Sequence, residues 1–423
     1  MKVICFGTLD KFSRFYLDIG KELMTNNGQL RIFSIHLSGF LYTLLRFKYS
    51  KCISLESWFL ALKKRRHYSR LYETTRTYKG VTIEEVISYH TLLSSSNSVK
   101  QLSLQAFAYI DIVDQSFAQF NPDYIICIGD TKMCIQIAVA LAKARDIEIR
   151  YIEQGPFSRT FYDKKGVNAN LSMRNQSMMN TSTFNSQKKI ISVKYRRSPL
   201  YRFIDMAFMY SLEKTRIYPP DLKYTDVNSF RLSKQMTPIN LKAGNRFLLV
   251  CQIPADVNSI IHSPHFQSHV DILKQVHQHL PSNSYLVVRE HPLFLGKYHK
   301  EFYNYIKQHS IEIENHSDLN NAISESTVVL VNNSTVGFES ICLYKTTVVL
   351  GNAFYDNNQI CLKLKNQTEL KKLLLNSLSY IPNKKSIDKF KDLLFNSVLI
   401  EGGISDKYLI ASKIIVRDLI LKK

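Results

Sequence analysis

Two short polar segments in the second half of the chain carry residue types that bind anions. Each comes directly after a short apolar run that is typical of a buried parallel strand. The segments are Arg289-Glu290-His291-Pro292 and Asn332-Asn333-Ser334-Thr335-Val336-Gly337-Phe338-Glu339. Open α/β sheets bind their ligands at the carboxyl ends of their strands, so this placement predicts a ligand site.

The second segment runs into residues 336–344, whose apolar spacing predicts a helix. Ser334 and Thr335 would then present hydroxyl and backbone N–H groups at the helix N-terminus, where a negative charge is favoured. A phosphate group is the simplest occupant of such a site.

The elements that must position these residues alternate along the chain. Apolar runs of strand length alternate with stretches of helical periodicity up to residue 152 and again from residue 247, which predicts parallel sheets with helical crossovers. Between residues 168 and 240 the alternation is lost and the sequence becomes polar and basic. We therefore predict an α/β fold with two Rossmann-like domains, residues 1–240 and 241–423, the second ending in a helix.

The clearest patterns define individual elements. Strands are predicted at residues 3–6, 124–128, 147–152 and 328–331, and helices at residues 11–24, 99–120, 133–145 and 270–280.

The composition fits a large α/β protein. The chain has 423 residues, 45% of them hydrophobic, which is enough for two cores. No apolar run reaches the roughly 18 residues of a membrane span, and the first residues resemble a strand more than a secretion signal, so we expect a cytoplasmic protein. The seven cysteines show no Cys-x-x-Cys spacing, which favours small buried hydrophobes over zinc ligands or disulfides.

The formal net charge of +21 suggests either an anionic partner or a highly charged solvent-exposed surface. Basic residues cluster between residues 46 and 70, beside the apolar and aromatic residues 40–45 and 58–60, and again between residues 188 and 202. This mixture favours peripheral contact with an anionic surface at the inner face of the cytoplasmic membrane. A solvated face is the alternative. We expect no nucleic-acid partner, because the sequence shows no helix-turn-helix, zinc-finger or RNP-type motif.

Two Rossmann-like domains that face each other across a cleft form the GT-B architecture of many glycosyltransferases. Neither half contains G-x-G-x-x-G or G-x-x-x-x-G-K-[ST], which argues against a dinucleotide dehydrogenase and a P-loop NTPase. No D-x-D stands where it could hold a metal between sugar-nucleotide phosphates. We therefore expect no metal and no cofactor, and a donor with a single phosphate, such as a CMP-sugar.

The motifs resemble, in order and spacing, the capsule polysaccharide biosynthesis family that includes the bacterial β-Kdo transferases. The resemblance extends over roughly residues 120–355. Besides the two anion-binding segments, it rests on Gln252-Ile253-Pro254-Ala255-Asp256 with Ser259, His262 and Ser263, and on Glu153-Gln154-Gly155 followed by Asp163-Lys164-Lys165-Gly166-Val167-Asn168. The chain departs from the family pattern at Gly129-Asp130, where Asn-Gly is common, and at Arg289, where lysine is frequent. These departures concern the donor more than the fold.

The resemblance implies a donor site in the second half. His291 and Arg289 would donate to the donor phosphate, and Ser334 and Thr335 would complete its surroundings. Glu339, one helical turn beyond Thr335, would accept from ribose hydroxyls or else be an exposed helix residue.

Four further binding residues are predicted. Gln252 and Asp256 would line the nucleotide pocket, or form a polar turn after their strand. Arg159 and Arg174 would pair with the carboxylate of a Kdo-type sugar, because a guanidinium matches a carboxylate bidentately.

Acidic residues in the first half are the candidates for chemistry at the sugar. Retention through a covalent intermediate needs two acidic groups near the anomeric carbon. The resemblance assigns Asp163 as nucleophile and Glu153 as general acid/base, with Asp130 in reserve. The alternative for Asp163 is a solvated turn.

These expectations lead to one favoured function and two alternatives. The favoured one is a retaining transferase that moves Kdo (3-deoxy-D-manno-oct-2-ulosonic acid) from CMP-Kdo to a glycan or lipid-linked acceptor in capsule or lipopolysaccharide assembly. A CDP-glycerol-type glycerophosphotransferase would share the fold without needing Asp163 as nucleophile. A non-catalytic lipid- or glycan-binding scaffold would use only the basic surface.

Overall fold

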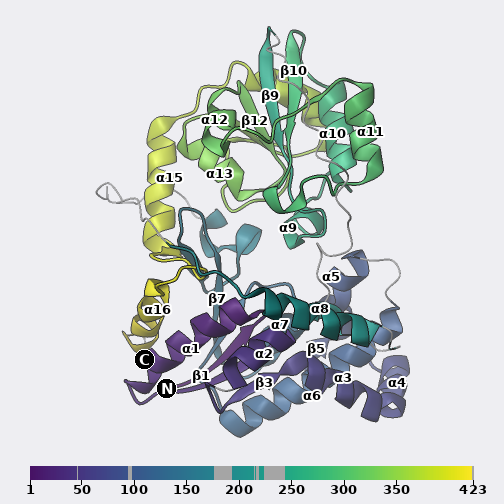
Figure 1. Cartoon of the computed structure of the whole chain (residues 1–423), viewed down its shortest axis with the longest axis vertical. Helices are drawn as coiled ribbons and strands as arrows, with labels where there is room; N and C mark the ends of the chain where they lie inside the picture. Colours follow the sequence, from purple (N-terminus) through teal and green to yellow (C-terminus); the bar gives the residue numbers. More distant parts are fainter. Residues whose placement is uncertain are drawn as a thin grey trace. The chain divides into compact units, whose positions relative to one another are not determined.

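The computed structural model describes residues 1–44, 46–93, 98–175, 193–213, 215, 219–222 and 243–421. The chain divides into two compact units, each an α/β body with a mainly parallel sheet (Figure 1). This confirms the predicted class, α/β with two Rossmann-like domains. No helix among the described residues is long and apolar enough to cross a bilayer.

Unit 1 comprises residues 1–167, 186–223 and 398–423. Its seven-stranded sheet has the order β15-β8-β7-β6-β1-β2-β3, in which β8 and β15 are antiparallel additions. The strands are β1 (Lys2–Gly7), β2 (Gln29–Ser34), β3 (Ser50–Cys52), β6 (Tyr124–Ile128), β7 (Glu148–Gln154), β8 (Thr160–Asp163) and β15 (Leu399–Ile400), with a separate hairpin of β4 (Thr77–Tyr78) and β5 (Val81–Thr82).

Helices cover both faces of this sheet. The helix α1 packs against α2 and α16, and α6 packs against α3, α5 and α7 (Figure 1). The helices are α1 (Asp10–Met24), α2 (Leu37–Leu44), α3 (Ile53–Lys63), α4 (Arg65–Thr74), α5 (Ile83–Leu93), α6 (Val99–Phe120), α7 (Met133–Lys143), α8 (Pro199–Glu213) and α16 (Ile410–Leu421).

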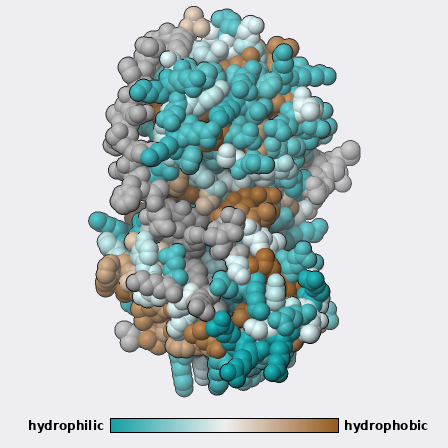
Figure 2. Space-filling view, turned by 90° about the vertical axis from the view of Figure 1, so that its right-hand side faces the viewer, coloured by the Kyte–Doolittle hydropathy of each residue, from teal (hydrophilic) through white to brown (hydrophobic). Residues whose placement is uncertain are grey.

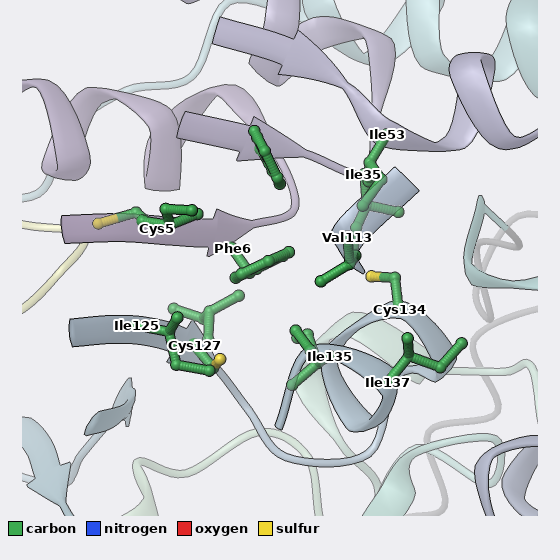
Figure 3. Packing of buried hydrophobic residues seen from close by; sticks show 14 of the residues in the cluster. Cys5, Phe6, Ile35, Ile53, Val113, Ile125, Cys127, Cys134, Ile135 and Ile137 are labelled. Atoms are coloured by element: carbon green, nitrogen blue, oxygen red, sulfur yellow. The ribbon is translucent and has the colours of Figure 1, made fainter. Parts of the chain in front are cut away.

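The core of unit 1 explains the cysteines of the first half. Cys5, Cys127 and Cys134 lie among branched and aromatic side chains, with Phe6 between the strand and helix layers (Figure 3). Burial raises the pKa of each of these thiols, so they remain protonated. They pack as small hydrophobes, as the sequence predicted.

Unit 2 comprises residues 168–185 and 224–397. Its sheet has the order β11-β10-β9-β12-β13-β14, and every pairing in it is parallel. The strands are β9 (Asn245–Val250), β10 (Ser284–Arg289), β11 (Glu312–Ile313), β12 (Val328–Val331), β13 (Thr346–Val349) and β14 (Leu362–Lys363). The helices are α9 (Val257–Ile260), α10 (His269–Gln278), α11 (Lys300–Gln308), α12 (Leu319–Ser324), α13 (Thr335–Cys342), α14 (Leu370–Ser377) and α15 (Lys384–Ser397).

The elements with the strongest sequence patterns are confirmed. The strands at residues 124–128 and 328–331 and the helix at residues 99–120 have the predicted limits, and the other predicted elements shift by one or two residues at their ends. The sequence did not predict α2 to α5 or the antiparallel strands β8 and β15. Two-residue strands such as β15 carry too few residues for a periodicity to show.

The division into units differs from the predicted domains. Residue 240 lies outside the described residues, and residues 398–423, predicted in the second domain, belong to unit 1. The reason is that β15 pairs with β8 and α16 packs on α1. Residues 168–175, predicted in the first domain, belong to unit 2.

Candidate active site

The candidate donor site lies at the carboxyl ends of the central strands of unit 2. The first strand, β9, is flanked by β10 on one side and β12 on the other, so the strand order reverses beside it. Doubly wound sheets bind ligands at such a switch point. Arg289 ends β10, and the other six donor-site residues predicted from the sequence lie in the segments that follow the three strands.

A reciprocal amide pair joins two of these segments. Gln252 Nε2 donates to Asn333 Oδ1 at 2.9 Å, and Asn333 N donates to Gln252 Oε1 at 3.2 Å. Both side chains are buried. Gln252 therefore fastens the loop after β9 to the loop after β12, and its place in the nucleotide pocket stays a prediction.

The N-terminus of α13 has the geometry predicted for an anion site. Ser334 is the N-cap, and its Oγ accepts from Val336 N at 3.3 Å. Its carbonyl accepts from the buried Tyr355 hydroxyl. Thr335, the first helical residue, is exposed. The first-turn N–H groups and the Thr335 hydroxyl can therefore meet a phosphate.

His291 is the second group suited to a phosphate. Its Nδ1 accepts from Leu293 N at 3.2 Å, which leaves the ring hydrogen of the neutral form on Nε2. Burial lowers the pKa of His291, which favours this neutral form. The imidazole is thus arranged to donate one hydrogen bond from Nε2.

Glu290, inside the same motif, holds this loop in place, a role that the sequence reading missed. Its buried carboxylate accepts from Gly296 N at 3.0 Å, from Asn315 Nδ2 at 2.7 Å and from the Tyr303 hydroxyl. The sequence signal for this role was an acid at the end of an apolar strand, between Arg289 and His291. An acid that is buried there needs several hydrogen-bond donors.

Arg289 has protein partners in the structure, and its role as a phosphate ligand stays a prediction. Its Nη1 pairs with the buried carboxylate of Glu314 at 2.8 Å, and its Nη2 donates to Ser317 O at 2.9 Å. Breaking this ion pair would leave the Glu314 carboxylate buried without a positive partner, which costs free energy. Arg289 therefore holds the segment after β11 in place.

Two acids border the donor site. Burial raises the pKa of Glu339, which lies half-buried one turn beyond Thr335 on α13. Burial also raises the pKa of Asp256, the N-cap residue of α9, which accepts from Asn258 Nδ2 at 3.2 Å. Glu339 remains a prediction as a ribose ligand. Asp256 lies in a polar turn, and its place in the nucleotide pocket also remains a prediction.

Arg174 is also committed elsewhere. Its Nε and Nη2 form a bidentate pair with Asp356 at 3.0 and 2.8 Å, Nη2 also reaches Asn352 Oδ1 at 3.1 Å, and Nη1 donates to Ala169 O at 3.1 Å. Lys363 pairs with the same carboxylate. The guanidinium therefore anchors residues 168–175 to unit 2, and its role as a ligand of the sugar carboxylate stays a prediction.

In unit 1, the predicted nucleophile and acid/base lie on one face of adjacent strands. The register of β7 and β8 pairs Glu153 with Phe161 and Tyr151 with Asp163. Cross-strand partners share a face, and so do residues two apart, so Glu153 and Asp163 are diagonal neighbours. Burial raises the pKa of Tyr151, and the negative charges of Asp130 and Asp163 raise it further. Both acids therefore lie near the Tyr151 hydroxyl.

Asp163 is buried and closes a turn. Its Oδ1 accepts from Lys165 N at 2.6 Å and from Gly166 N at 3.2 Å. Asp130 accepts from Val167 N at 3.1 Å through Oδ2 and from the Thr131 hydroxyl at 2.9 Å through Oδ1. The two acids thus hold the same loop, residues 164–167, from opposite ends.

The remaining predicted residue, Arg159, lies in the loop between β7 and β8, half-buried. Burial lowers its pKa, and the negative charge of Glu401 opposes this shift. It stays a prediction as a ligand of the sugar carboxylate.

Sequence reasoning missed Lys11, a partly buried cation of unit 1. It is the second residue of α1, at the point where the strand order of this sheet reverses between β1 and β6. Burial lowers its pKa, and the charge of Glu153 opposes this shift most strongly. Lys11 therefore faces the predicted acid/base.

The second basic cluster, between residues 188 and 202, is partly paired with acids in the structure. Lys188 and Lys189 lie outside the described residues, but Arg197 pairs with the buried Asp10 and Asp205 and Lys194 pairs with Asp406. Acids outside residues 188–202 therefore neutralise part of this cluster.

Among the described residues, no group of three or more histidine, cysteine, aspartate or glutamate side chains is placed to hold a metal. The arrangement offers hydrogen-bond donors for a phosphate in unit 2 and paired carboxylates in unit 1. Together with the two Rossmann-like units, these sites define a glycosyltransferase-like α/β protein.

The family follows from the sequence itself. The model of the family described as "Capsule polysaccharide biosynthesis protein" matches residues 123–402, which is more than half of the chain. The chain belongs to this family. The matched range includes every predicted site residue.

Individual relatives are distant. Protein FixF of Sinorhizobium fredii is 25% identical over 186 residues, which is 43% of this chain and 44% of that protein, so the match spans less than half of this curated relative. The β-Kdo 2,7 transferase of Thermosulfurimonas dismutans KpsC is 16% identical with a TM-score of 0.34, covering 69% of this chain and 86% of the other. A UDP-GlcNAc 2-epimerase of Methanocaldococcus jannaschii is 12% identical with a TM-score of 0.37, covering all of both chains.

Proposed function

We propose that this protein is a retaining glycosyltransferase that moves Kdo from CMP-Kdo to a glycan or glycolipid acceptor in capsule or lipopolysaccharide assembly. The observation that carries the proposal is the pairing of an exposed Thr335 at the N-terminus of α13 with a neutral His291 that has Nε2–H free to donate. The family membership and the resemblance of the motifs to the β-Kdo transferases support the choice of donor.

Unit 2 binds the nucleotide in this proposal. The first-turn N–H groups of α13, the Thr335 hydroxyl and His291 donate to the single phosphate of CMP, and they stabilise the charge that this phosphate gains as it leaves. Glu339 accepts from a ribose hydroxyl. No metal or cofactor takes part, because these donors supply the positive potential themselves.

Unit 1 supplies the carboxylates. Asp163 attacks the anomeric carbon of Kdo through the oxygen that does not close the turn, and the bond to CMP breaks. Glu153 then takes the proton of the acceptor hydroxyl, which attacks the same carbon and frees Asp163. Lys11 places a positive charge beside Glu153. Arg159 is the candidate partner of the Kdo carboxylate.

The acceptor and its location complete the proposal. A lipid-linked acceptor would bring the protein to the inner face of the cytoplasmic membrane. The exposed Lys63, Arg65 and Arg66, next to the exposed Phe59 and Leu62 on α3, support contact with an anionic surface there. The surface of unit 1 mixes hydrophobic and hydrophilic patches (lower part of Figure 2).

Intact-protein mass spectrometry with CMP-Kdo generated in situ tests the mechanism. The wild type should gain the mass of one Kdo residue, and Asp163→Asn should not. The amide oxygen of the introduced side chain can still accept from Lys165 N and Gly166 N, so this variant should keep its turn and its melting temperature. Glu153→Gln should form the adduct but release it to acceptor at least about 100-fold more slowly.

Three results would contradict the proposal. An adduct on Asp163→Asn would move the nucleophile, and CMP release with acceptor but no adduct on either protein would indicate direct transfer. CMP release from CDP-glycerol, with Asp163→Asn fully active, would identify a glycerophosphotransferase instead.

A further inference from the structure

A pocket of about 640 Å³ opens on the outer helices of unit 1, along the length of α1. It is formed by α1, by α2 with the residues after it, and by the start of α16 with the residues before it. Figure 1 shows α16 beside α1. The predicted acids of unit 1 do not line it, so it belongs to a different site.

The charge of this pocket is strongly positive. Five cations line it, and Asp18 is the one acid among its lining residues. The carboxylate of Asp18 is already engaged, because the Ser412 hydroxyl donates to it at 2.5 Å. The cations are Arg14, Lys21, Arg46, Lys407 and Lys413.

Most of these cations form no ion pair with another described residue. Within that part of the chain only Lys413 forms an ion pair, with Glu22 at 3.8 Å. Arg14 donates through Nη1 to Lys407 O at 3.1 Å and through Nη2 to Asp406 O, and Arg46 donates to Tyr42 O at 2.8 Å. Arg14 Nε is buried without a hydrogen-bond partner in the described part of the chain, and a buried donor in that state is costly. An anion in the pocket would balance the charge of the cations that form no ion pair.

The rest of the lining is apolar. Met24, Tyr408 and Ile410 are exposed at the pocket by 53%, 69% and 43%, and Leu17, Phe47 and Leu409 add partly buried surface. A free inorganic anion gains nothing from such surface. An amphiphile with a phosphate next to an acyl chain would satisfy both the cations and the apolar side chains.

We infer that this pocket binds the phosphate headgroup and the adjoining acyl segment of an anionic phospholipid, and so holds unit 1 on a lipid surface. The inference goes beyond the proposed reaction and does not depend on it. It adds a defined lipid site to the general attraction expected from the basic surface. The sequence separates its parts by almost 400 residues, from Arg14 to Lys413.

The test compares three charge-reversal pairs in the full-length protein. Lys21→Glu/Lys407→Glu lies in the pocket, Lys63→Glu/Arg66→Glu lies on the α3–α4 surface, and Lys371→Glu/Lys372→Glu lies on α14 of unit 2. All six side chains are exposed and form no ion pair with another described residue, and each pair changes the net charge equally. Melting temperatures verify that the variants fold.

Co-sedimentation with vesicles of phosphatidylglycerol and phosphatidylcholine measures lipid binding. The pocket pair should lower the partition coefficient at least about tenfold, since each basic residue near an anionic surface contributes about 1 kcal/mol. The α14 pair should change it less than about threefold. A loss with the α3–α4 pair and none with the pocket pair would overturn the inference.

Calorimetric titration with monomeric dihexanoyl phosphatidylglycerol, below its micellar concentration, tests for a saturable site. One lipid should bind per chain, and Lys21→Glu/Lys407→Glu should abolish this binding. Inorganic phosphate at the same concentration should not compete. Equal competition by phosphate would identify a simple anion site, and no saturable binding would also overturn the inference. Adduct formation with CMP-Kdo should be unchanged in the pocket pair, so the failure of one proposal would be distinct from the failure of the other.

Discussion

Asn333 and Gln252 exchange two hydrogen bonds across the switch point of unit 2, and Asn333 Nδ2 also donates to the carbonyls of Asn258 and His262, both at 2.8 Å. One buried amide therefore joins three segments: the strand end of β9, the loop around α9 and the strand end of β12. The N-terminal end of α13, the proposed phosphate site, begins at the next residue, so this amide determines where Ser334 and Thr335 lie.

Asn333→Asp should be strongly destabilising for this reason. The change replaces two donated hydrogen bonds by contacts between a carboxylate oxygen and carbonyl oxygens, at a cost of about 3 kcal/mol. Differential scanning calorimetry should show a lower melting temperature. Asn366→Asp is the matched control, because Asn366 is an exposed N-cap whose side chain only accepts, from Thr368 N and the Thr368 hydroxyl. An equal melting temperature for both variants would contradict this account.

The ion pair of Arg174 with Asp356 predicts a structural phenotype. Arg174→Gln and Asp356→Asn should each lower the melting temperature, and the double variant should lose less than the sum of the two. We expect about 2 kcal/mol for Arg174→Gln, because Lys363 still balances Asp356. Arg417→Gln, which removes an exposed charge that pairs with no acid in the described ranges, should leave the melting temperature unchanged. A raised KM for the donor with an unchanged melting temperature would instead support Arg174 as a ligand of the sugar.

Gly337 in the first turn of α13 packs against Tyr355. A Cβ atom at this position would lie 2.8 Å from Tyr355 Cζ and 2.7 Å from Val331 Cγ2, and closer still to the tyrosine hydroxyl. Gly337→Ala should therefore displace α13 and destabilise unit 2 by about 3 kcal/mol. Tyr355→Phe should restore part of the loss in the double variant, since it removes the nearest atom. Independent, additive losses would show that the clash is relieved elsewhere.

Acid should destabilise unit 2 through His269. Its Nε2 accepts from Gln252 N at 3.0 Å, and burial lowers its pKa from 6.5 to about 4. The unfolded chain binds this proton first as the pH falls, so the stabilisation is complete above pH 6.5 and is lost progressively between pH 6.5 and 4. The loss is about 3 kcal/mol.

Melting curves between about pH 7 and pH 4 measure this dependence. His269→Gln keeps an acceptor for Gln252 N but cannot be protonated, so its melting temperature should fall less steeply over this interval. An identical slope in both proteins would assign the pH dependence to other groups, such as the buried His36 of unit 1.

Local patterns predicted much of the fold. The apolar run at residues 328–331 and the serine after it are sufficient to predict a buried strand, a turn and a capped helix, because each depends on residues within one or two turns of the chain. His291 and Thr335 were predicted as site residues in the same way. Their positions depend on the end of a strand and the start of a helix, and both are visible in a single stretch of sequence.

The partners of charged side chains could not be predicted from local patterns. Nothing near Arg289 in the sequence indicates Glu314, and nothing near Arg174 indicates Asp356, so both arginines were predicted as ligand contacts. A guanidinium pairs with whichever acid the fold brings to it, and here that acid comes from another segment that is 25 or 182 residues away.

The sequence by itself determined the α/β class, the two Rossmann-like domains and the capped N-terminal end of α13, because these depend on the periodicity and order of neighbouring residues. Only the tertiary structure decided that residues 398–423 complete unit 1, that Glu153 and Asp163 share a face, and that α1, α2 and α16 enclose a basic pocket. Each of these depends on strand register or helix packing between distant segments, which is set by burial of the whole core and leaves no local pattern.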